Sequence, residues 1–296
     1  MAPQEWRTLC ILVSYWSHMG QYMLTTQATM QIWMNSYGND FASLARAQGL
    51  CSSLTSVVNF IVGPAGGALS DCIGRKPMMY VGPVADLAQR LITLPLMDAR
   101  SEGLARVLFG SLAGATGQSH ATALADVYSS DPVQLGIWQS RLAMGSTVMT
   151  MVLPVASSAL SIRNLRLPLL ISAVACLCNV LLISTTVTET LRPAHRKPWS
   201  WSSSNPLSMV QLFCKGGRLR VLCAIAMVES LVNTATRVGG GGGALLDIYQ
   251  AEHLGWGLGD RGQFASVAAM LTVPGYLVMP LLMRAFGASA LRGLPS

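Results

Sequence analysis

Charge chemistry in this chain is concentrated in one short segment between two apolar stretches. The segment reads Gly67-Ala-Leu-Ser-Asp71-Cys-Ile-Gly74-Arg75-Lys76-Pro77 and combines an acid, a helix-breaking glycine and two adjacent cations. Asp71 can accept hydrogen bonds or face the positive end of a neighbouring helix, and Arg75 offers a forked set of donors that suits a carboxylate. We expect a tight turn at a membrane surface, where the backbone reverses and the cations anchor it.

Further ionisable side chains fall inside the apolar stretches, where a buried charge is costly unless it meets a partner or water. Asp86 and Arg90 lie one helical turn apart, so they either neutralise each other or serve a function together. Glu229, Asn233 and Arg237 recur every four residues and share one helix face. That face either lines a cavity or ends near the membrane interfaces.

Histidine changes charge near neutral pH, so His18 and His120 are either proton carriers or satisfied packing residues. Polar side chains elsewhere in the apolar runs are the remaining candidates for contact with a solute or a proton. The expected cavity residues are Gln21, Asn59, Asp86, Arg90, His120, Glu229 and Arg237.

Covalent chemistry has little support in the sequence. The seven cysteines form no CxxC pair or metal-ligand spacing, and no nucleophile stands beside a base. The run Gly239 to Gly243 lacks the strand and the following Lys-Ser or Lys-Thr of a phosphate-binding loop. It indicates a helix break, a low-complexity insertion or an error in the gene model. We therefore expect no enzyme activity, no cofactor and no metal.

The composition indicates the environment in which these residues lie. Of 296 residues, 51% are hydrophobic and only 11% are charged, with a mean hydropathy of +0.45, whereas soluble domains carry roughly 25% charged residues. The chain is therefore expected to be an all-α membrane protein in a lipid bilayer. The net charge is +7, and the basic residues are scattered between apolar blocks, which excludes nucleic-acid binding. We expect the basic residues to mark the cytoplasmic side of the membrane.

Apolar runs long enough to cross a bilayer give eight predicted spans. They are 8–34, 48–69, 78–97, 104–126, 137–160, 166–187, 218–247 and 263–286. The predicted domains are a six-helix bundle over 1–187, a linker over 188–217 and a partial second bundle of two helices over 218–296. We expect the second bundle to be truncated after its second helix.

The basic residues predict the orientation of these spans. With the amino terminus in the cytoplasm, an even number of spans returns both the 67–77 turn and the 188–217 linker to the cytoplasm. All three lysines, Lys76, Lys197 and Lys215, then lie inside. Lysine and arginine are enriched in cytoplasmic loops, so we expect a multi-pass protein with its amino terminus and its linker on that side.

The spacing Gly67-xxx-Asp71-xx-Gly74-Arg75-Lys76 resembles the signature between the second and third helices of the major facilitator superfamily. The resemblance implies a major facilitator fold in which this segment latches the cytoplasmic side in the outward-open state. Asp126, at the predicted inner end of the fourth span, is the partner that we expect. The expected gating residues are Gly67, Asp71, Gly74, Arg75, Lys76 and Asp126.

Other segments extend the resemblance. Thr188-Glu189-Thr190-Leu191 and Ile248 to Trp256 resemble tetracycline-resistance-like and hippocampus-abundant-transcript-like transporters. Arg106, followed by spaced glycines, is similar to the family's fourth helix, where it is either a functional charge or an interface anchor. The fifth span departs from the drug and proton antiporters, because Gly145 and Pro154 stand nine positions apart instead of adjacent.

The resemblance implies secondary active transport of a small organic solute by alternating access, with antiport against protons left open. The alternative is a membrane protein that does not transport: a receptor, a regulatory partner of a transporter or an inactive fragment of one. Uptake and efflux assays discriminate between the two.

Overall fold

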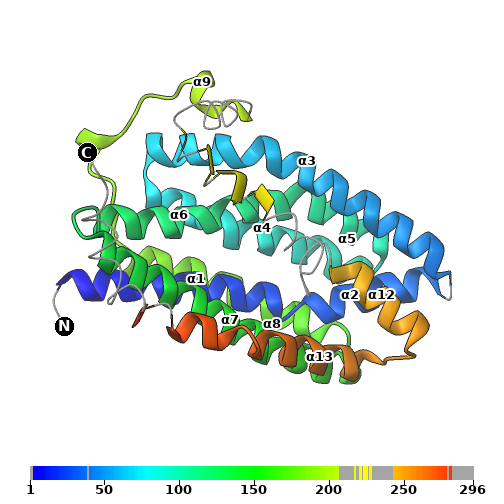
Figure 1. Cartoon of the computed structure of the whole chain (residues 1–296). Coiled ribbons are helices and arrows are strands. Elements are labelled where there is room, and N and C mark those ends of the chain that lie inside the picture. Colours follow the sequence, from blue (N-terminus) through cyan, green and yellow to red (C-terminus); the bar gives the residue numbers. More distant parts are fainter. Residues whose placement is uncertain are drawn as a thin grey trace.

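A computed structural model shows how the predicted spans are built. It describes residues 3–38, 40–206, 217, 220, 221, 223–225, 227, 228, 243–278, 280 and 281. Every regular element in this part of the chain is helical, which confirms the expected all-α fold. Figure 1 shows long helices lying roughly side by side, with α1 starting at the end of the bundle where α3 and α8 finish. We call this the amino-terminal end.

The first bundle contains the long helices. In chain order its elements are α1 (Pro3–Met23), α2 (Thr26–Tyr37), α3 (Phe41–Ile73), α4 (Arg75–Leu96), α5 (Ala99–Ala105), the π-helical turn η1 (Arg106–Gly110), α6 (Ser111–Val127), α7 (Pro132–Arg163) and α8 (Leu167–Thr186). The short elements η2 (Pro193–His195) and α9 (Trp201–Ser204) follow, and α12 (Gly243–His253) and α13 (Leu258–Met270) come last.

Aspartates begin several of these helices. Asp40 accepts a hydrogen bond from the N–H of Ser43 at the start of α3, and Asp98 accepts one from Ser101 at the start of α5. Hydrogen bonds from the side chain and then from the N–H of Ser43 lower the pKa of Asp40, and those from Ser101 lower the pKa of Asp98 in the same way. An ionised carboxylate at this position satisfies N–H groups that have no partner within the helix.

Two predicted spans differ in detail from the structure. The span 8–34 is divided into α1 and α2, because the N–H of Thr25 bonds to the carbonyl of Tyr22 instead of that of Gln21. The span 104–126 begins in α5 and passes through η1 before α6. A π-helical turn inserts an extra residue into the helix and is often found at functional sites.

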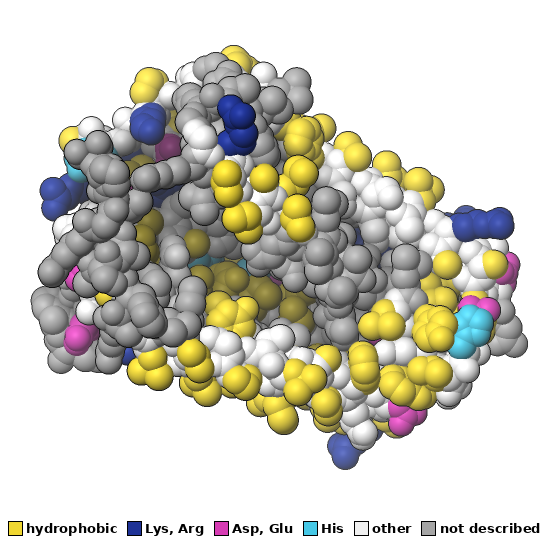
Figure 2. Space-filling view, viewed as in Figure 1, with side chains coloured by type: hydrophobic (Ala, Val, Ile, Leu, Met, Phe, Trp, Pro, Cys, Tyr) yellow, Lys and Arg dark blue, Asp and Glu magenta, His cyan; other side chains and the backbone are white. Residues whose placement is uncertain are grey.

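Three described helices are long and apolar enough to cross a membrane: α3, α7 and α8. The other predicted spans of the first bundle are divided between elements or carry buried polar residues, as α4 does with Asp86, Gln89 and Arg90. Figure 2 shows hydrophobic side chains on the outer faces of α3 and α13. On α3 they include Leu54, Val57 and Phe60, all about half exposed, as a lipid-facing surface requires.

Helix α1 packs against α7, α8 and α6. The indole of Trp16 donates a hydrogen bond to the carbonyl of Leu142 at 3.0 Å, and a Cβ at Gly145 would collide with that ring. The absence of a side chain at Gly145 therefore lets α7 approach α1. This packing role of Gly145 does not require the adjacent proline of the antiporter pattern, and Pro154 lies nine positions away.

The end of the chain contacts the first bundle. Helix α13 lies along α7 and also touches α2, while α12 packs on α3. The predicted span 218–247 falls largely outside the described residues, and α13 begins five residues before the predicted start at 263 and ends at Met270. A Cβ at Gly262 would lie 2.9 Å from the carbonyl oxygen of Pro154, so α13 and α7 approach as closely as their backbones allow.

Candidate functional site

Arg75 binds two carboxylates at the amino-terminal end of the bundle. Its Nη1 lies 2.6 Å from Oδ1 of Asp71, and its Nε lies 2.9 Å from Oδ2 of Asp126. Nη1 also donates to the hydroxyl of Ser70 at 3.0 Å. One buried guanidinium therefore ties the end of α3 and the end of α6 to the start of α4. We call Asp71, Arg75, Asp126 and Glu189, which is described below, the charge cluster.

The turn expected over 67–77 is a single residue. Residues 67–73 continue α3, and Arg75 already belongs to α4, so Gly74 alone reverses the chain. It has φ of 118°, where residues with a side chain are strained. A Cβ at this position would also collide with the carboxylate of Glu189. Both the backbone angle and the close approach of Glu189 require glycine.

Glu189 was not among the predicted gating residues, yet it binds the start of α4. Its Oε1 accepts from the N–H of Arg75 at 2.9 Å and from the N–H of Leu191 at 3.0 Å, while Oε2 accepts from the N–H of Lys76 at 3.2 Å. The first N–H groups of a helix lack partners within it, and a carboxylate there also suits the helix dipole. Glu189 therefore caps α4 from the beginning of the linker.

The linker crosses the charge cluster. The hydroxyl of Thr190 lies 3.4 Å from Oδ2 of Asp126, and the N–H of Lys197 donates to the carbonyl of Asp71 at 3.1 Å. Lys76 extends its Nζ to the carbonyl of Ser184 in α8, at 3.0 Å. Of the predicted motif, Gly67 has open space around it. The charge cluster and Lys76 together join α3, α4, α6 and α8 to the linker.

A second polar group is buried inside the first bundle. His18, Gln21 and Asp86 are 6%, 2% and 1% exposed. The Nε2 of Gln21 lies 3.0 Å from Nδ1 of His18 and 3.2 Å from Oδ2 of Asp86. The carboxylate of Asp86 thus contacts α1 instead of Arg90, whose Nε lies 3.4 Å from the hydroxyl of Ser172 in α8. Packing of α1 against α4 outweighs the one-turn spacing of Asp86 and Arg90.

The remaining cavity candidates do not join this group. His120 is buried, with Nε2 3.2 Å from the hydroxyl of Ser14 and its ring against Tyr15. Asn59 is exposed on α3 and lies beside Gly114 of α6. Glu229 and Arg237 lie outside the described residues.

Arg106 lies in a third polar group, at the end of the bundle opposite the charge cluster. Its Nη2 donates to Oε1 of Gln48 at 2.8 Å, and its guanidinium lies 5.6 Å from the ring centre of Trp33. Glu102 accepts hydrogen bonds from the indole of Trp33 and the amide of Gln89. Glu102, which is 1% exposed, was not predicted as a site residue. Arg106 is packed among these groups instead of reaching outward as an anchor.

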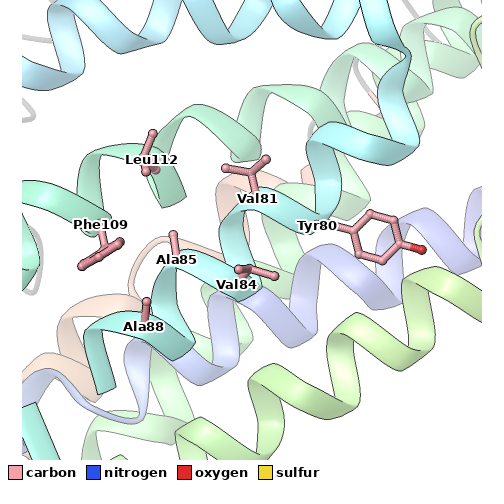
Figure 3. A pocket seen from close by; sticks show the side chains of 7 residues that line it. All are labelled: Tyr80, Val81, Val84, Ala85, Ala88, Phe109 and Leu112. Carbon is pink, nitrogen blue, oxygen red and sulfur yellow. The ribbon is translucent and has the colours of Figure 1, made fainter. Parts of the chain in front are cut away.

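An apolar pocket of about 290 Å³ lies between α4 and the η1–α6 segment. Figure 3 shows five side chains from α4 and two, Phe109 and Leu112, from the facing segment. Among the residues that line the pocket, Tyr80 alone has a polar group on its side chain. The pocket therefore fits an apolar group better than a charged solute. Within the described ranges no three His, Cys, Asp or Glu side chains are grouped to hold a metal ion.

Comparison with known proteins identifies a family and two solved structures with a similar fold. A family model described as the Major Facilitator Superfamily matches residues 10–294. The crystal structure of the human organic anion transporter MFSD10 (TETRAN) is similar with a TM-score of 0.75 and 15% identity, over 96% of this chain and 73% of that chain. A POT family transporter in complex with a thioalcohol conjugated peptide gives a TM-score of 0.58 and 13% identity, over 98% and 71%. No curated protein sequence matches. At these identities the structures show a shared fold.

Proposed function

Because the chain belongs to the Major Facilitator Superfamily, whose members are membrane transporters, we propose that it moves a small organic solute across a membrane by alternating access. In that mechanism two helical bundles rock against each other around a central site. The family and the fold indicate a transporter and not an enzyme. The solute, the coupling ion and the role of each residue belong to the proposal.

The observation that carries this proposal is the charge cluster. Arg75 and Glu189 between them contact the ends of α3, α4 and α6 and the start of the linker. The side chains of Asp71 and Asp126 are 37% and 25% exposed, so water can solvate both carboxylates once the linker moves. Because each carboxylate is partly exposed, opening these ion pairs costs less than opening a fully buried pair, which suits a latch that must close and release in every transport cycle.

The orientation completes the proposal. With the amino terminus and the 188–217 linker in the cytoplasm, the charge cluster is a cytoplasmic gate. Lys76 and Lys197 lie beside it, as expected for cytoplasmic loops. The division into 1–187, 188–217 and 218–296 is supported by the irregular backbone that follows α8. Antiport against protons is the finer proposal, and the buried group of His18 and Asp86 favours it.

The test is transport by the purified protein in lipid vesicles, with a panel of organic anions, peptides and neutral solutes, each with and without a pH gradient. We expect at least one solute to be taken up in a saturable way and Arg75→Gln to reduce that uptake at least tenfold. The matched control is Arg141→Gln, which removes an exposed arginine on α7 that stacks on Trp138 and is expected to transport normally. If every solute moves no faster with the native protein than with Arg75→Gln, the chain is a membrane protein that does not transport these solutes.

A further inference from the structure

The hydrogen bonds of the buried group in the first bundle depend on which ring nitrogen of His18 carries the proton. An amide nitrogen only donates hydrogen bonds, so Gln21 must donate one hydrogen to Nδ1 of His18, at 3.0 Å, and the other to Oδ2 of Asp86, at 3.2 Å. In this arrangement Nδ1 accepts and carries no proton, so the imidazole hydrogen lies on Nε2.

A second arrangement is available to the same side chains. Nδ1 of His18 also lies 3.4 Å from Oδ2 of Asp86. If Nδ1 gains a proton it becomes a donor, so it can pair with Asp86 but can no longer accept from Gln21. The carbonyl oxygen Oε1 of Gln21 has no hydrogen-bond partner in the described structure and can then turn toward the new donor. Proton binding thus exchanges one set of hydrogen bonds for another.

The surroundings leave the carboxylate available for this exchange. Three other titratable groups lie in the same buried region: Arg90 on α4, Cys176 on α8 and Tyr22 on α1. Asp86 and Arg90 both act electrostatically on Cys176 and on Tyr22. The next titratable group along α6 is His120, which faces Ser14 and Tyr15. The part of α7 packed against this stretch of α1 presents Gly145, Met149 and Leu153, which are uncharged. Oδ2 of Asp86 lies beside Gln21 and His18, whereas Arg90 contacts the hydroxyl of Ser172.

The same group is attached to the break between α1 and α2. The carbonyl of Gln21 has lost its helical partner, since the N–H of Thr25 bonds to Tyr22, and it accepts instead from the hydroxyl of Ser172 at 2.8 Å. That hydroxyl in turn lies 3.4 Å from Nε of Arg90. The side chain of Gln21 contacts Asp86, and its carbonyl is bonded to Ser172, which contacts Arg90. A rearrangement of the Gln21 side chain therefore acts on the residues that stabilise the break.

We propose that His18, Gln21 and Asp86 form a proton-binding site, and that protonation of His18 at Nδ1 changes the backbone at the Leu24–Thr25 break. The ligand is a single proton, which binds the Nδ1 lone pair and leaves it when the site deprotonates. The use of this proton in transport rests on the proposed function, whereas its binding does not. Helix breaks commonly flank transporter sites, so the break is the element through which the proton affects transport.

The first test is nuclear magnetic resonance of the protein in lipid nanodiscs with ¹⁵N-labelled histidine. The chain has four histidines, so His18→Gln assigns the His18 signals. At alkaline pH we expect the Nε2–H tautomer, and an imidazolium as the pH falls. Asp86→Asn removes the carboxylate and is expected to lower the midpoint of this titration by one pH unit or more, a tenfold loss of proton affinity.

His253→Gln, on the exposed surface of α12, is the matched control and should leave the His18 midpoint unchanged. Thermal unfolding of each variant establishes that it is folded. The proposal is overturned if His18 stays neutral throughout the pH range in which the protein is folded, or if Asp86→Asn does not move the midpoint.

The second test measures the break itself. Amide hydrogen exchange of a peptide covering Gln21 to Thr26, corrected for the intrinsic effect of pH, should change across the His18 midpoint in the native protein and stay constant in His18→Gln. Unchanged exchange in the native protein would overturn the link to the break. In vesicles, His18→Gln should lose the acceleration of solute uptake that a pH gradient gives the native protein. A histidine that titrates in a protein without transport would instead refute the proposed function and leave the proton site standing.

Discussion

At the scale of single residues, Arg75 is the side chain on which the charge cluster depends. It is buried between two carboxylates from different helices, and its planar fork allows Nη1 and Nε to serve one carboxylate each. A lysine would supply the charge but only one point of contact. The cluster is therefore specific for arginine in geometry as well as in charge.

Replacing Arg75 tests the ion pairs. Arg75→Gln leaves Asp71 and Asp126 without a cation, and we expect a loss of about 2 kcal/mol in the free energy of unfolding, between the values for exposed and buried pairs. Arg75→Lys should lose about half as much. The measurement is the unfolding midpoint in detergent at low and high salt. The native protein should lose stability with salt and Arg75→Gln should not; equal salt dependence in both would contradict the role of the pairs.

Gly74 is the second decisive residue. Gly74→Ala combines a strained φ of 118° with a collision against Glu189, and we expect a loss of about 3 kcal/mol in the free energy of unfolding. Gly255→Ala is the matched control, because its φ of 64° is also positive but its surroundings are open, so about 1 kcal/mol should be lost. The double variant Gly74→Ala with Glu189→Ala should lose less than the sum of the two single changes, as measured by thermal unfolding.

At the scale of elements, the helices follow from local patterns and their junctions do not. The i, i+4 spacing of Asp71 and Arg75 is visible in the sequence, and so is the glycine that ends α3. Glu189 caps α4 from 114 residues away, and no local pattern signals such a contact. Asp86 shows the converse: its local partner Arg90 is displaced by His18 because α1 packs against α4 in the folded protein. Sequence periodicity predicted the spans, but it could not predict the break at Leu24–Thr25, which depends on Ser172 from α8.

The contact between α1 and α7 gives a prediction at this scale. Gly145→Ala places a Cβ inside the indole of Trp16, which must move and lose its bond to Leu142, so we expect a loss of about 2 kcal/mol. Gly20→Ala lies on the same interface, but its Cβ would be 3.4 Å from a tip of Leu153. That contact is ordinary, and alanine favours helix, so the stability should stay within about 1 kcal/mol of the native value. Thermal unfolding compares the two, and equal losses would rule out a specific notch at Gly145.

At the scale of the whole molecule, α13 is the helix of the predicted second bundle that lies along α7 of the first. Arg261 of α13 donates to Gln31 of α2 at 3.0 Å, at the end of the bundle opposite the charge cluster. Ser157 and Ser161 on α7 and Ser266 on α13 have buried hydroxyls without hydrogen-bond partners in the described part of the chain. Such groups gain hydrogen bonds when water enters. The contact between α7 and α13 is therefore close, and water that enters it would satisfy these hydroxyls, which fits the proposed alternating access.

A reversible cross-link tests whether this contact opens during transport. A Cβ at Gly262 would lie 3.1 Å from that of Ser158, and a disulfide needs about 3.5–4.5 Å, so a small separation of α13 from α7 accommodates Ser158→Cys with Gly262→Cys. We expect oxidation to stop solute uptake in vesicles and a reducing agent to restore it. Each single variant, oxidised in the same way, controls for the seven native cysteines.

The cross-link restricts movement only, because it adds no charge and changes neither the charge cluster nor His18. A loss of uptake on oxidation would therefore report movement between α7 and α13, and not a change in the charge cluster or in His18. If the oxidised protein transports at the native rate, α7 and α13 move as one body and the opening lies elsewhere. If uptake stops and returns on reduction, the small-residue contact between them must part in every cycle, and the hydroxyls of Ser157, Ser161 and Ser266 are the groups that water meets when it does.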